Sequence, residues 1–564
     1  IVIIGAVALG PKAACRFKRL SPEARVTMID ASTTISYGGC GIPYFVSGDV
    51  SAPEELQRTS FHMLRDEYFF EHAKGVNVLT GTEALSIDRD QRKVRIRNLA
   101  SKDESDLSYD KLVIATGSVP RRLGIEGEDL PGVYNVGNLA DAIAIRESIT
   151  KNGVNKAVIV GAGFIGLEMA EALADMWGIE TTVVEIADRV LPGLVSSHLA
   201  KAASLHMEEN EVSFLFQESV THIEGDGKVE RVVTNKRTLD ADMCIISAGI
   251  LPNSRLAAEA GLAISERGGI LVDEQMRSSD PLIYAGGDCV HIKNQVTGKP
   301  FFLPMGSMAN RQGRVIGNNL AGEESAFDGA VGSFAVKLFE QAVSGAGLSI
   351  DTALREGFDA INVHMVQLDR AHFYPEKGLM SFDLVVEKPT GRVLGVQGMS
   401  HMRDALVGRI NAVAAILKDK PHVSDLSNME FAYSPPFSSA MDVINSLGNV
   451  ADNILSGRNR GMGPDEFKGL WEESSDGEIH FMDCRAAADA SPYVEKHPGR
   501  WHNIPQDEIP KRLAEIPMGK RLVLVCNTGA RSYEAQVMLD QAGFTDSLNV
   551  EGGMAAIKNQ GTDI

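Results

Sequence analysis

Two cysteines lie in segments where a thiol could be chemically reactive. Cys40 lies in "SYGGCGIPY", residues 36–44, among glycines and tyrosines. Cys526 ends the apolar run "RLVLVC" and precedes a short polar loop. The thiolate form of cysteine attacks S–S bonds, so both positions are candidates for sulfur chemistry. No second cysteine follows Cys40 within the next five residues, so Cys40 cannot form a local disulfide.

The remaining cysteines are scattered along the chain without C-x-x-C pairs. This spacing fits neither a disulfide framework nor a zinc site, and we expect no metal site. A structural role is the favoured interpretation for Cys15, Cys244, Cys289 and Cys484.

A glycine-rich turn at residues 161–166, "GAGFIG", predicts a dinucleotide-binding unit. Gly161, Gly163 and Gly166 lie between a strand-like run and a helical pattern. The first glycine permits a tight turn, the second lets the backbone approach a pyrophosphate, and the third lets helix and strand pack closely. Glu185 ends the next strand-like run, where a carboxylate accepts hydrogen bonds from a ribose 2′-hydroxyl and repels a 2′-phosphate. NADH is therefore favoured as the donor, with NADPH as the alternative because Arg189 lies nearby.

A weaker copy of this unit opens the chain. "GAVALG" supplies Gly5 and Gly10, with Val7 where the central glycine is expected. Asp30 ends the following strand-like run, and Asp288 lies in "YAGGDC" after a later one. Carboxylates in such places bind ribose or ribityl hydroxyl groups. The two copies together predict two nucleotide-binding domains.

Composition and charge limit the class of protein. A chain of 564 residues with 44% hydrophobic and 23% charged residues is long enough for roughly three to five domains. The net charge of −20 argues against nucleic acid or an anionic membrane as a partner. No run of about 18 apolar residues and no basic, apolar leader is present, so we expect a cytoplasmic protein without a membrane span.

The order of "ATGSVP", "GAGFIG", "SAGILPN" and "YAGGDC" resembles that of the two-dinucleotide-binding-domain flavoprotein disulfide reductases, over residues 1 to about 450. Within that family, "SYGGCGIPY" is similar to the single-cysteine segment of the coenzyme A disulfide reductase and persulfide reductase branch. The resemblance implies FAD on the first unit and NAD(P)H on the second. The cofactor-binding residues that it implies are Gly5, Gly10, Asp30, Thr116, Gly117, Asp288, Gly161, Gly163, Phe164, Gly166, Glu185 and Gly249.

The resemblance also implies how Cys40 would act. Its sulfur partner would come from the substrate, and electrons from NADH would pass through FAD to release Cys40 from a mixed disulfide or persulfide. This branch of the family has a dimerisation domain whose tyrosines reach the partner's active site. Tyr433 in "FAYSPPFSSAMD" and, less clearly, Tyr374 in "HFYPEKG" match that pattern, although a tyrosine in an apolar run is more often a core residue.

Coenzyme A recognition is implied in the same way. The matching positions are Lys12, Arg16, Arg19, Ser36, Lys74 and Asn310. Arginine suits phosphate groups, whereas the alternative interpretation of residues 12–19 is a solvated helix face. Gly39 and Met441 stand where some relatives have asparagine and lysine.

The last 90 or so residues resemble rhodanese. Besides the segment around Cys526, "FMDCR" and "NVEGGMAAI" match two further rhodanese segments. The resemblance implies a loop whose backbone N–H groups surround the sulfur of Cys526, with Arg531 attracting anionic sulfur species.

We therefore expect an α/β protein with two Rossmann-like domains, an α+β dimerisation domain and a C-terminal rhodanese α/β domain. The expected bounds are 1–113 and 245–322 for FAD, 114–244 for NAD(H), 323–450 for dimerisation, 451–470 for a linker and 471–564 for rhodanese. The expected function is NADH-dependent reduction of coenzyme A disulfide, coenzyme A persulfide or polysulfide by a homodimer. Two alternatives stay open: an NADH oxidase or peroxidase that cycles through a sulfenic acid, and a non-enzymatic sulfur carrier or redox sensor.

Overall fold

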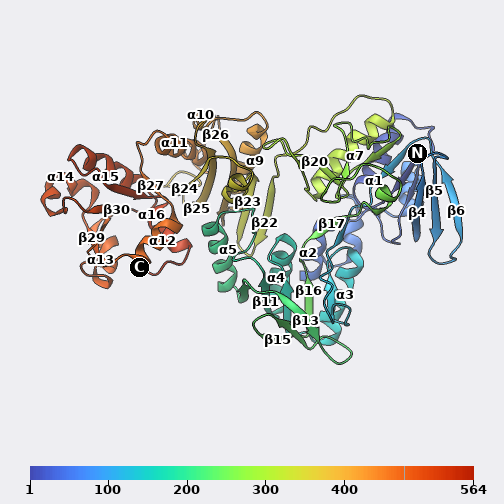
Figure 1. Cartoon of the computed structure of the whole chain (residues 1–564), viewed down its shortest axis with the longest axis horizontal. Coiled ribbons are helices and arrows are strands. Elements are labelled where there is room, and N and C mark those ends of the chain that lie inside the picture. Colours follow the sequence, from blue (N-terminus) through green and yellow to red (C-terminus); the bar gives the residue numbers. More distant parts are fainter. Residues whose placement is uncertain (476) are drawn as a thin grey trace. The chain divides into compact units, whose positions relative to one another are not determined.

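The computed structural model describes residues 1–475 and 477–564 (Figure 1). The chain forms two compact units. The first unit comprises Ile1–Ile186 and Glu211–Ala330, and the second comprises Ala187–Asn210 and Val331–Ile564. Among the described helices, none is long and apolar enough to cross a membrane.

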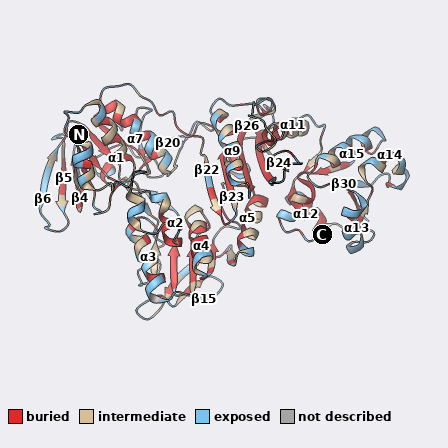
Figure 2. Ribbon diagram, turned by 180° about the vertical axis from the view of Figure 1, so that it is seen from behind, coloured by how far each residue is buried: buried red, intermediate tan, exposed pale blue. Residues whose placement is uncertain are grey.

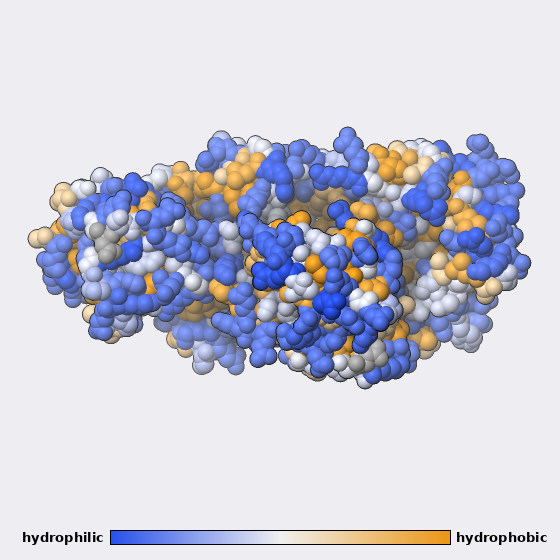
Figure 3. All heavy atoms as spheres, turned by 60° about the horizontal axis from the view of Figure 1, so that its bottom comes forward, coloured by the Kyte–Doolittle hydropathy of each residue, from blue (hydrophilic) through white to orange (hydrophobic). Residues whose placement is uncertain are grey.

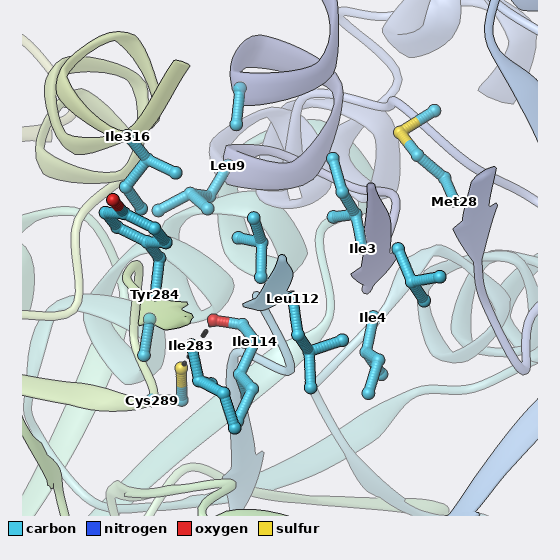
Figure 4. Close-up of a cluster of buried hydrophobic side chains, with 14 of the residues drawn as sticks. Ile3, Ile4, Leu9, Met28, Leu112, Ile114, Ile283, Tyr284, Cys289 and Ile316 are labelled. Carbon is cyan, nitrogen blue, oxygen red and sulfur yellow. Dashed lines mark hydrogen bonds between the residues drawn. The ribbon is translucent and has the colours of Figure 1, made fainter. Parts of the chain in front are cut away.

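The first unit begins with a five-stranded parallel sheet in the order β19-β7-β1-β2-β3. Its strands are β1 (Val2–Ile4), β2 (Thr27–Ile29), β3 (Asn77–Leu79), β7 (Leu112–Ile114) and β19 (Ile283–Ala285). Helices α1 (Leu9–Leu20) and α7 (Gly306–Leu320) pack against each other. Figure 4 shows Leu9 and Ile316 from these helices beside the side chains of the sheet. The central strands are apolar along their length because both faces of a parallel sheet are covered.

The second nucleotide-binding unit has its own parallel sheet, in the order β12-β11-β10-β16-β9. Its strands are β9 (Val133–Asn135), β10 (Lys156–Val160), β11 (Glu180–Glu185), β12 (Val212–Phe216) and β16 (Met243–Ile246). Helix α3 (Leu139–Asn152) precedes β10, and helix α4 (Phe164–Trp177) follows it. The strand, glycine turn and helix predicted at residues 157–176 are thus present.

Antiparallel strands join the two nucleotide-binding units. β8 (Ser118–Pro120) pairs with β17 (Ile250–Pro252), so the motifs "ATGSVP" and "SAGILPN" lie side by side. The first compact unit also has two three-stranded antiparallel sheets. One contains β4 (Thr82–Asp88), β5 (Lys93–Asn98) and β6 (Glu104–Ser108). The other contains β13 (Val220–Glu224), β14 (Arg231–Thr234) and β15 (Thr238–Asp240). A three-stranded mixed sheet contains β18 (Ile270–Leu271), β20 (Val290–Lys293) and β21 (Pro300–Phe301).

The second unit contains a five-stranded antiparallel sheet in the order β22-β23-β26-β25-β24. Its strands are β22 (Phe334–Leu338), β23 (Gln341–Gly347), β24 (Ala360–Leu368), β25 (Leu379–Glu387) and β26 (Arg392–Ser400). Helix α9 (Arg403–Leu417) packs against β23 and β26, and α11 (Val443–Leu455) packs against β24. Helix α5 (Ser197–Glu209) follows β11 in the chain but belongs to this unit.

The second unit also contains a C-terminal parallel sheet in the order β27-β31-β30-β28-β29. Its strands are β27 (Gly461–Met462), β28 (Ile479–Asp483), β29 (Trp501–Asn503), β30 (Arg521–Val525) and β31 (Ser547–Val550). Its helices include α12 (Pro464–Glu473), α13 (Ala487–Lys496), α15 (Ala530–Gln541) and α16 (Gly553–Asn559).

Residues 451–470, expected to form a linker, contain regular structure. The end of α11, strand β27 and much of α12 lie in this range. Phe467 and Trp471 of α12 belong to the hydrophobic core of the C-terminal sheet. Glycine and charge predicted a linker here, but the apolar residues among them are spaced to bury one helix face.

Burial follows the sheets in both units. Figure 2 shows buried residues concentrated in the strands, whereas outer helices such as α3 and α13 carry many exposed residues. On the face drawn in Figure 3, hydrophilic residues predominate.

Two glycines in residues 161–166 have different roles: Gly166 is needed for packing, whereas Gly163 leaves space for a ligand. A side chain at Gly166 would place its Cβ 1.9 Å from the carbonyl oxygen of Gly161, whereas a Cβ at Gly163 would meet nothing within 4 Å. We expect Gly166→Ala to lower the free energy of unfolding by about 1–3 kcal/mol because of overpacking. Gly163→Ala should leave that free energy unchanged but raise KM for NADH, because the methyl group obstructs the pyrophosphate. Urea unfolding and NADH titration measure the two effects, and equal destabilisation by both variants would contradict the assignment.

Candidate active site

Cys40 lies in a short 3₁₀ turn, Gly39–Gly41, and is exposed. Helix α2 (Ile42–Ser47) follows immediately and has Pro43 in its first turn, where the fixed φ of proline suits a helix. On the N-terminal side, the backbone N–H of Ser36 donates to the carbonyl of Ala6 at 2.8 Å. The reactive segment is therefore tied to the glycine turn of the first nucleotide-binding unit.

The second nucleotide-binding unit also holds this segment in place. Arg146 of α3 donates to the carbonyls of Phe45 and Val50 at 3.0 and 2.9 Å. Trp177, the last residue of α4, donates its indole N–H to the carbonyl of Val46 at 2.8 Å. These donors fix the helix that directly follows Cys40.

The N-terminus of α7 lies beside the sulfur of Cys40. A Cβ built on Gly306 would lie 3.6 Å from Cys40 Sγ. The positive end of a helix dipole stabilises negative charge, and hence a thiolate. Asn310, one turn further along α7, donates to the carbonyl of Gly306 at 2.9 Å, which places this predicted substrate-binding residue near Cys40.

Two ionisable groups near α2 were not singled out from the sequence. Burial raises the pKa of the Tyr44 phenol, and the charges of Glu168 and Glu171 raise it further. Burial, followed by the charge of Glu171, raises the pKa of Glu168 to about 7. Tyr44 lies one helical turn after Cys40, a spacing that could have been noticed. Glu168 faces α2 only because α4 packs on it, which no local pattern reveals.

The two predicted nucleotide loops have the same construction. Gly5 and Gly161 both have positive φ, at 110° and 106°. In the first loop, the N–H of Ala6 donates to Asp30 Oδ2 at 2.8 Å; in the second, that of Ala162 donates to Glu185 Oε2 at 2.7 Å. Each carboxylate therefore lies against its glycine turn.

These loops fit dinucleotides. The open space at Gly163 leaves the backbone accessible to a pyrophosphate, while Val7 occupies the corresponding position of the first loop. Burial raises the pKa of both Asp30 and Asp288. A buried carboxylate without a cation accepts hydrogen bonds from ligand hydroxyl groups, which suits the ribose and ribityl chain of FAD.

The other predicted cofactor residues lie around the β8 and β17 crossover. Thr116 Oγ1 donates to the carbonyl of Asn253 at 2.5 Å, and Ser118 Oγ donates to Asp288 Oδ2 at 3.3 Å. Gly117 and Gly249 both have positive φ, which bends each segment where it leaves its sheet. Phe164 is the first residue of α4 and directly follows Gly163.

The predicted coenzyme A residues lie in different surroundings. Lys12, Arg19 and Lys74 surround Cys15: burial raises the pKa of this thiol, whereas the positive charges of Lys74, Arg19 and Lys12 lower it. Arg16 is already engaged, since its Nε donates to Asn318 Oδ1 at 2.5 Å and its Nη2 pairs with Glu323 at 3.3 Å.

Ser36 contributes differently from the cationic residues. It is 3% exposed and adopts a positive φ of 51°. The positive charges of Lys12, Arg19 and Lys74 thus all act on the thiol of Cys15, while Ser36 is part of the segment that leads to Cys40.

The second unit carries the remaining predicted site residues. Tyr433 is 52% exposed, so it is not a core residue in this chain. Tyr374 is partly buried, with the guanidinium of Arg370 5.9 Å from its ring centre.

Cys526 lies at the carboxyl end of β30, in a loop that leads into α15. Its sulfur accepts hydrogen bonds from the N–H of Gly529 at 3.1 Å and from Ser532 Oγ at 3.3 Å. The N–H of Met554 donates to the carbonyl of Cys526 at 2.8 Å, which ties the loop to the first turn of α16. N–H donors and a helix N-terminus around one sulfur stabilise its anionic forms, including a persulfide.

Cys484 and Arg531 complete the surroundings of this loop. Burial raises the pKa of Cys484, and the nearby charge of Cys526 raises it further, whereas Arg531 lowers it. Cys484 is therefore a structural thiol, and Arg531 lies close enough to contribute positive charge at the loop. Ser532, a direct donor to Cys526, was not predicted from the sequence.

Comparisons with known proteins identify the family. The profile of the pyridine nucleotide-disulphide oxidoreductases matches residues 1–307, that of their dimerisation domain matches residues 333–443, and that of the rhodanese-like domain matches residues 466–560. The chain belongs to the pyridine nucleotide-disulphide oxidoreductases. This oxidoreductase therefore combines the expected nucleotide-binding, dimerisation and rhodanese domains in one α/β chain.

Individual relatives resemble this oxidoreductase over most of its length. An NAD(P)H sulfur oxidoreductase (CoA-dependent) of Pyrococcus abyssi is 35% identical, covering 80% of this chain and 97% of the relative. The structure of an NAD-dependent persulfide reductase from A. fulgidus is 38% identical with a TM-score of 0.92, over 98% of this chain and 99% of that one. That of reduced Bacillus anthracis CoADR-RHD is 30% identical with a TM-score of 0.89, over 99% and 97% of the two chains.

Glu168 makes stability depend on pH. Its pKa of about 7 lies above the ordinary 4.5, so the folded state binds more protons between these values and loses stability as the pH rises through them. Glu168→Gln should therefore raise the free energy of unfolding by about 1–2 kcal/mol at pH 8 and have little effect at pH 4.5. Urea unfolding at both pH values measures this, with Glu180→Gln, at an exposed position on β11, as the control. A pH-independent effect would contradict the assigned cause.

Proposed function

We propose that this oxidoreductase uses NADH to reduce coenzyme A persulfide, coenzyme A disulfide or polysulfide at Cys40. The observation that carries the proposal is a single exposed cysteine beside the N-terminus of α7, in a segment without a second thiol. The sulfur and persulfide reductases similar to this chain support the same substrate class.

The regions proposed to bind the two cofactors are those expected from the sequence. Residues 1–113 and 245–322 would bind FAD, and residues 114–244 would bind NADH. Asp30 and Asp288 would accept hydrogen bonds from FAD, and Gly161, Gly163 and Glu185 would hold NADH. Bound FAD would carry two electrons from NADH to the sulfur of Cys40.

Cys40 would act as the nucleophile. With a coenzyme A persulfide, its thiolate attacks the carbon-bound sulfur, the S–S bond breaks, and HS⁻ leaves, so that Cys40 and coenzyme A form a mixed disulfide. Two electrons and one proton then return the Cys40 thiolate and free coenzyme A. The net reaction consumes one persulfide and one NADH with a proton, and releases coenzyme A, H₂S and NAD⁺.

Groups near Cys40 would assist this chemistry. The α7 N-terminus stabilises the thiolate before attack and after its release. Tyr44 and Glu168, whose pKa values are raised, are candidates to supply or hold the proton.

The rhodanese domain would handle sulfane sulfur. Gly529 and Ser532 would hold a persulfide on Cys526 through the hydrogen bonds that they donate to its sulfur. Arg531 would attract anionic sulfur donors.

The substrate must approach a protein of strongly negative net charge. Lys12, Arg19 and Lys74 form a local cationic group, which would attract the phosphates of coenzyme A. Arg16 would have to exchange Glu323 for a phosphate, so its contribution to affinity is smaller.

We further propose that the active form is a homodimer. The segment of residues 429–441 exposes Tyr433, Phe437 and Met441 by 52, 70 and 55%. Exposed apolar side chains this close together mark an interaction surface. Together with the match to the dimerisation domain, they support Tyr433, and with it Tyr374, as residues that would reach the partner's substrate.

The two cysteines should have separable roles. Cys40→Ser should lower NADH-dependent persulfide reduction at least about 10³-fold while FAD remains bound, because the nucleophile is lost. Cys526→Ser should retain this reduction but lose sulfur transfer from a rhodanese donor. NADH oxidation, sulfide release and flavin absorbance measure the three properties. A Cys40→Ser enzyme that still reduces persulfide would overturn the mechanism, and oxygen consumption that exceeds persulfide turnover in the wild type would favour an NADH oxidase.

The cationic group should matter only for substrates that carry coenzyme A. Arg19→Ala and Lys74→Ala should each raise KM for coenzyme A persulfide about 5–10-fold, because a charge-assisted phosphate contact is lost, and leave KM for inorganic polysulfide unchanged. Arg25→Ala, an exposed position beyond the end of α1, is the matched control. Equal effects on both substrates would show that these residues do not bind coenzyme A.

A further inference from the structure

Three ionisable side chains meet in the interior of the second unit. His198 comes from the first turn of α5, His364 from β24 and Asp383 from β25, where His364 and Asp383 are direct partners across the antiparallel pair. All three are buried, at 7, 3 and 0% exposure. The mechanism proposed above uses none of them.

The atoms that meet are potential metal ligands. His198 Nε2 lies 3.0 Å from His364 Nδ1 and 2.8 Å from Asp383 Oδ1, and His364 Nδ1 lies 2.9 Å from the same oxygen. Within the described part of the chain, these three residues are the group whose donor atoms are arranged to hold a metal ion.

Hydrogen bonds alone cannot satisfy this triangle. A ring nitrogen that carries a proton has no lone pair with which to accept, and a carboxylate only accepts. If both nitrogens that face each other carry protons, the contact between the two histidines is repulsive. If either nitrogen lacks its proton, that nitrogen faces the carboxylate of Asp383 as a second acceptor. A cation at the centre, by contrast, uses one lone pair from each atom.

The surrounding contacts resemble the outer shell of a metal site. Asp465 Oδ2 lies 3.7 Å from His198 Nδ1, the ring nitrogen that points away from the triangle. A carboxylate against the second nitrogen of a ligating histidine fixes its tautomer and orientation. Ser196 donates to Asp383 Oδ2, and its oxygen lies 3.4 Å from His198 Nε2.

The electrostatic environment attracts positive charge. Two carboxylates face His198: Asp383 Oδ1 lies 2.8 Å from Nε2 and Asp465 Oδ2 lies 3.7 Å from Nδ1. A cation placed against these two carboxylates would be attracted by their negative charges.

We propose that His198, His364 and Asp383 bind a divalent transition-metal ion of the zinc class, with Ser196 or a water as the fourth ligand. Two imidazoles and one carboxylate suit such an ion, whereas Ca²⁺ and Mg²⁺ prefer oxygen ligands. Bond lengths of about 2.0–2.1 Å in tetrahedral geometry separate neighbouring ligand atoms by about 3.3 Å. The observed separations of 2.8 to 3.0 Å need an expansion of only a few tenths of an ångström.

The ion would connect the antiparallel sheet of the second unit, which contains β24 and β25, to the loop around Cys526. The N–H of His364 donates to Glu551 Oε2 at 2.6 Å. A Cβ at Gly552 would lie 2.8 Å from Cδ2 of the His364 imidazole, so this ring packs directly on the backbone that leads to Gly553. A Cβ on Gly553 would in turn lie 2.3 Å from the carbonyl oxygen of Cys526. The ion is therefore structural: it holds His364 in place, and the segment that supports the loop around Cys526 packs on this residue.

Metal content of the full-length holoenzyme tests the proposal. After removal of metal with a chelator, incubation with Zn²⁺ and dialysis, the wild type should retain about one zinc per chain by elemental analysis. His364→Gln should retain less than about a tenth of this amount. Zinc should raise the unfolding temperature of the wild type and not that of His364→Gln, because an ion that binds only the folded state stabilises it.

His206→Gln is the matched control. His206 lies on the same helix and also faces a carboxylate, with its Nδ1 3.8 Å from Glu209. This variant should keep the zinc, and because it retains every cysteine of His364→Gln, zinc held by thiols would appear in both. Equal zinc content in the two variants would overturn the proposal. So would a wild-type protein that retains no zinc after incubation, a result that does not depend on whether His364→Gln folds.

Discussion

A close backbone contact at two glycines is the constraint on which the nucleotide-binding half of this oxidoreductase depends. A Cβ on Gly5 would lie 2.1 Å from the carbonyl oxygen of Ala115, and one on Gly161 would lie 2.6 Å from that of Ser247. Each nucleotide turn therefore packs directly on the first residue of the "ATG" or "SAG" motif, which follows the neighbouring strand of the same sheet. Because the strands that follow these motifs pair as β8 and β17, one pair of hydrogen-bonded strands connects the two nucleotide turns.

The position of the Cys40 thiol follows from this connection between the domains. Cys40 belongs in sequence to the first nucleotide-binding unit, but Arg146 and Trp177 of the second hold the helix that follows it. A reactive atom must be held within about 0.5 Å to be effective, and such precision requires supports on rigid elements. Here the supports are α3 and α4, helices of the second nucleotide-binding unit. The domain proposed to bind NADH thus also positions the cysteine proposed as the nucleophile.

The sequence predicted the features that depend on local patterns. Glycine spacing predicted both nucleotide turns, and the apolar run before Cys526 predicted a strand that ends in a loop; both elements are present. The linker prediction at 451–470 relied on polar composition and overlooked Met462 and Phe467, which belong to the core of the C-terminal sheet. Ser532, Glu168 and the triangle of His198, His364 and Asp383 could not be predicted, since each depends on packing between segments that are distant in sequence or on the geometry of one loop. Cysteine spacing, which led us to expect no metal site, carries no information about histidines on separate elements.

The buried triangle has an energetic cost that ordinary packing would avoid. Apolar residues of similar volume often stabilise a protein as well as or better than a buried ion pair, because charges lose their hydration on burial. Buried polar clusters act instead through geometry: their directional contacts are satisfied in one arrangement and not in neighbouring ones. In this chain that arrangement connects α5, the antiparallel sheet and the segment from Glu551 to Gly553. The loop around Cys526 rests on that segment, so the cluster supports this loop without touching the sulfur itself.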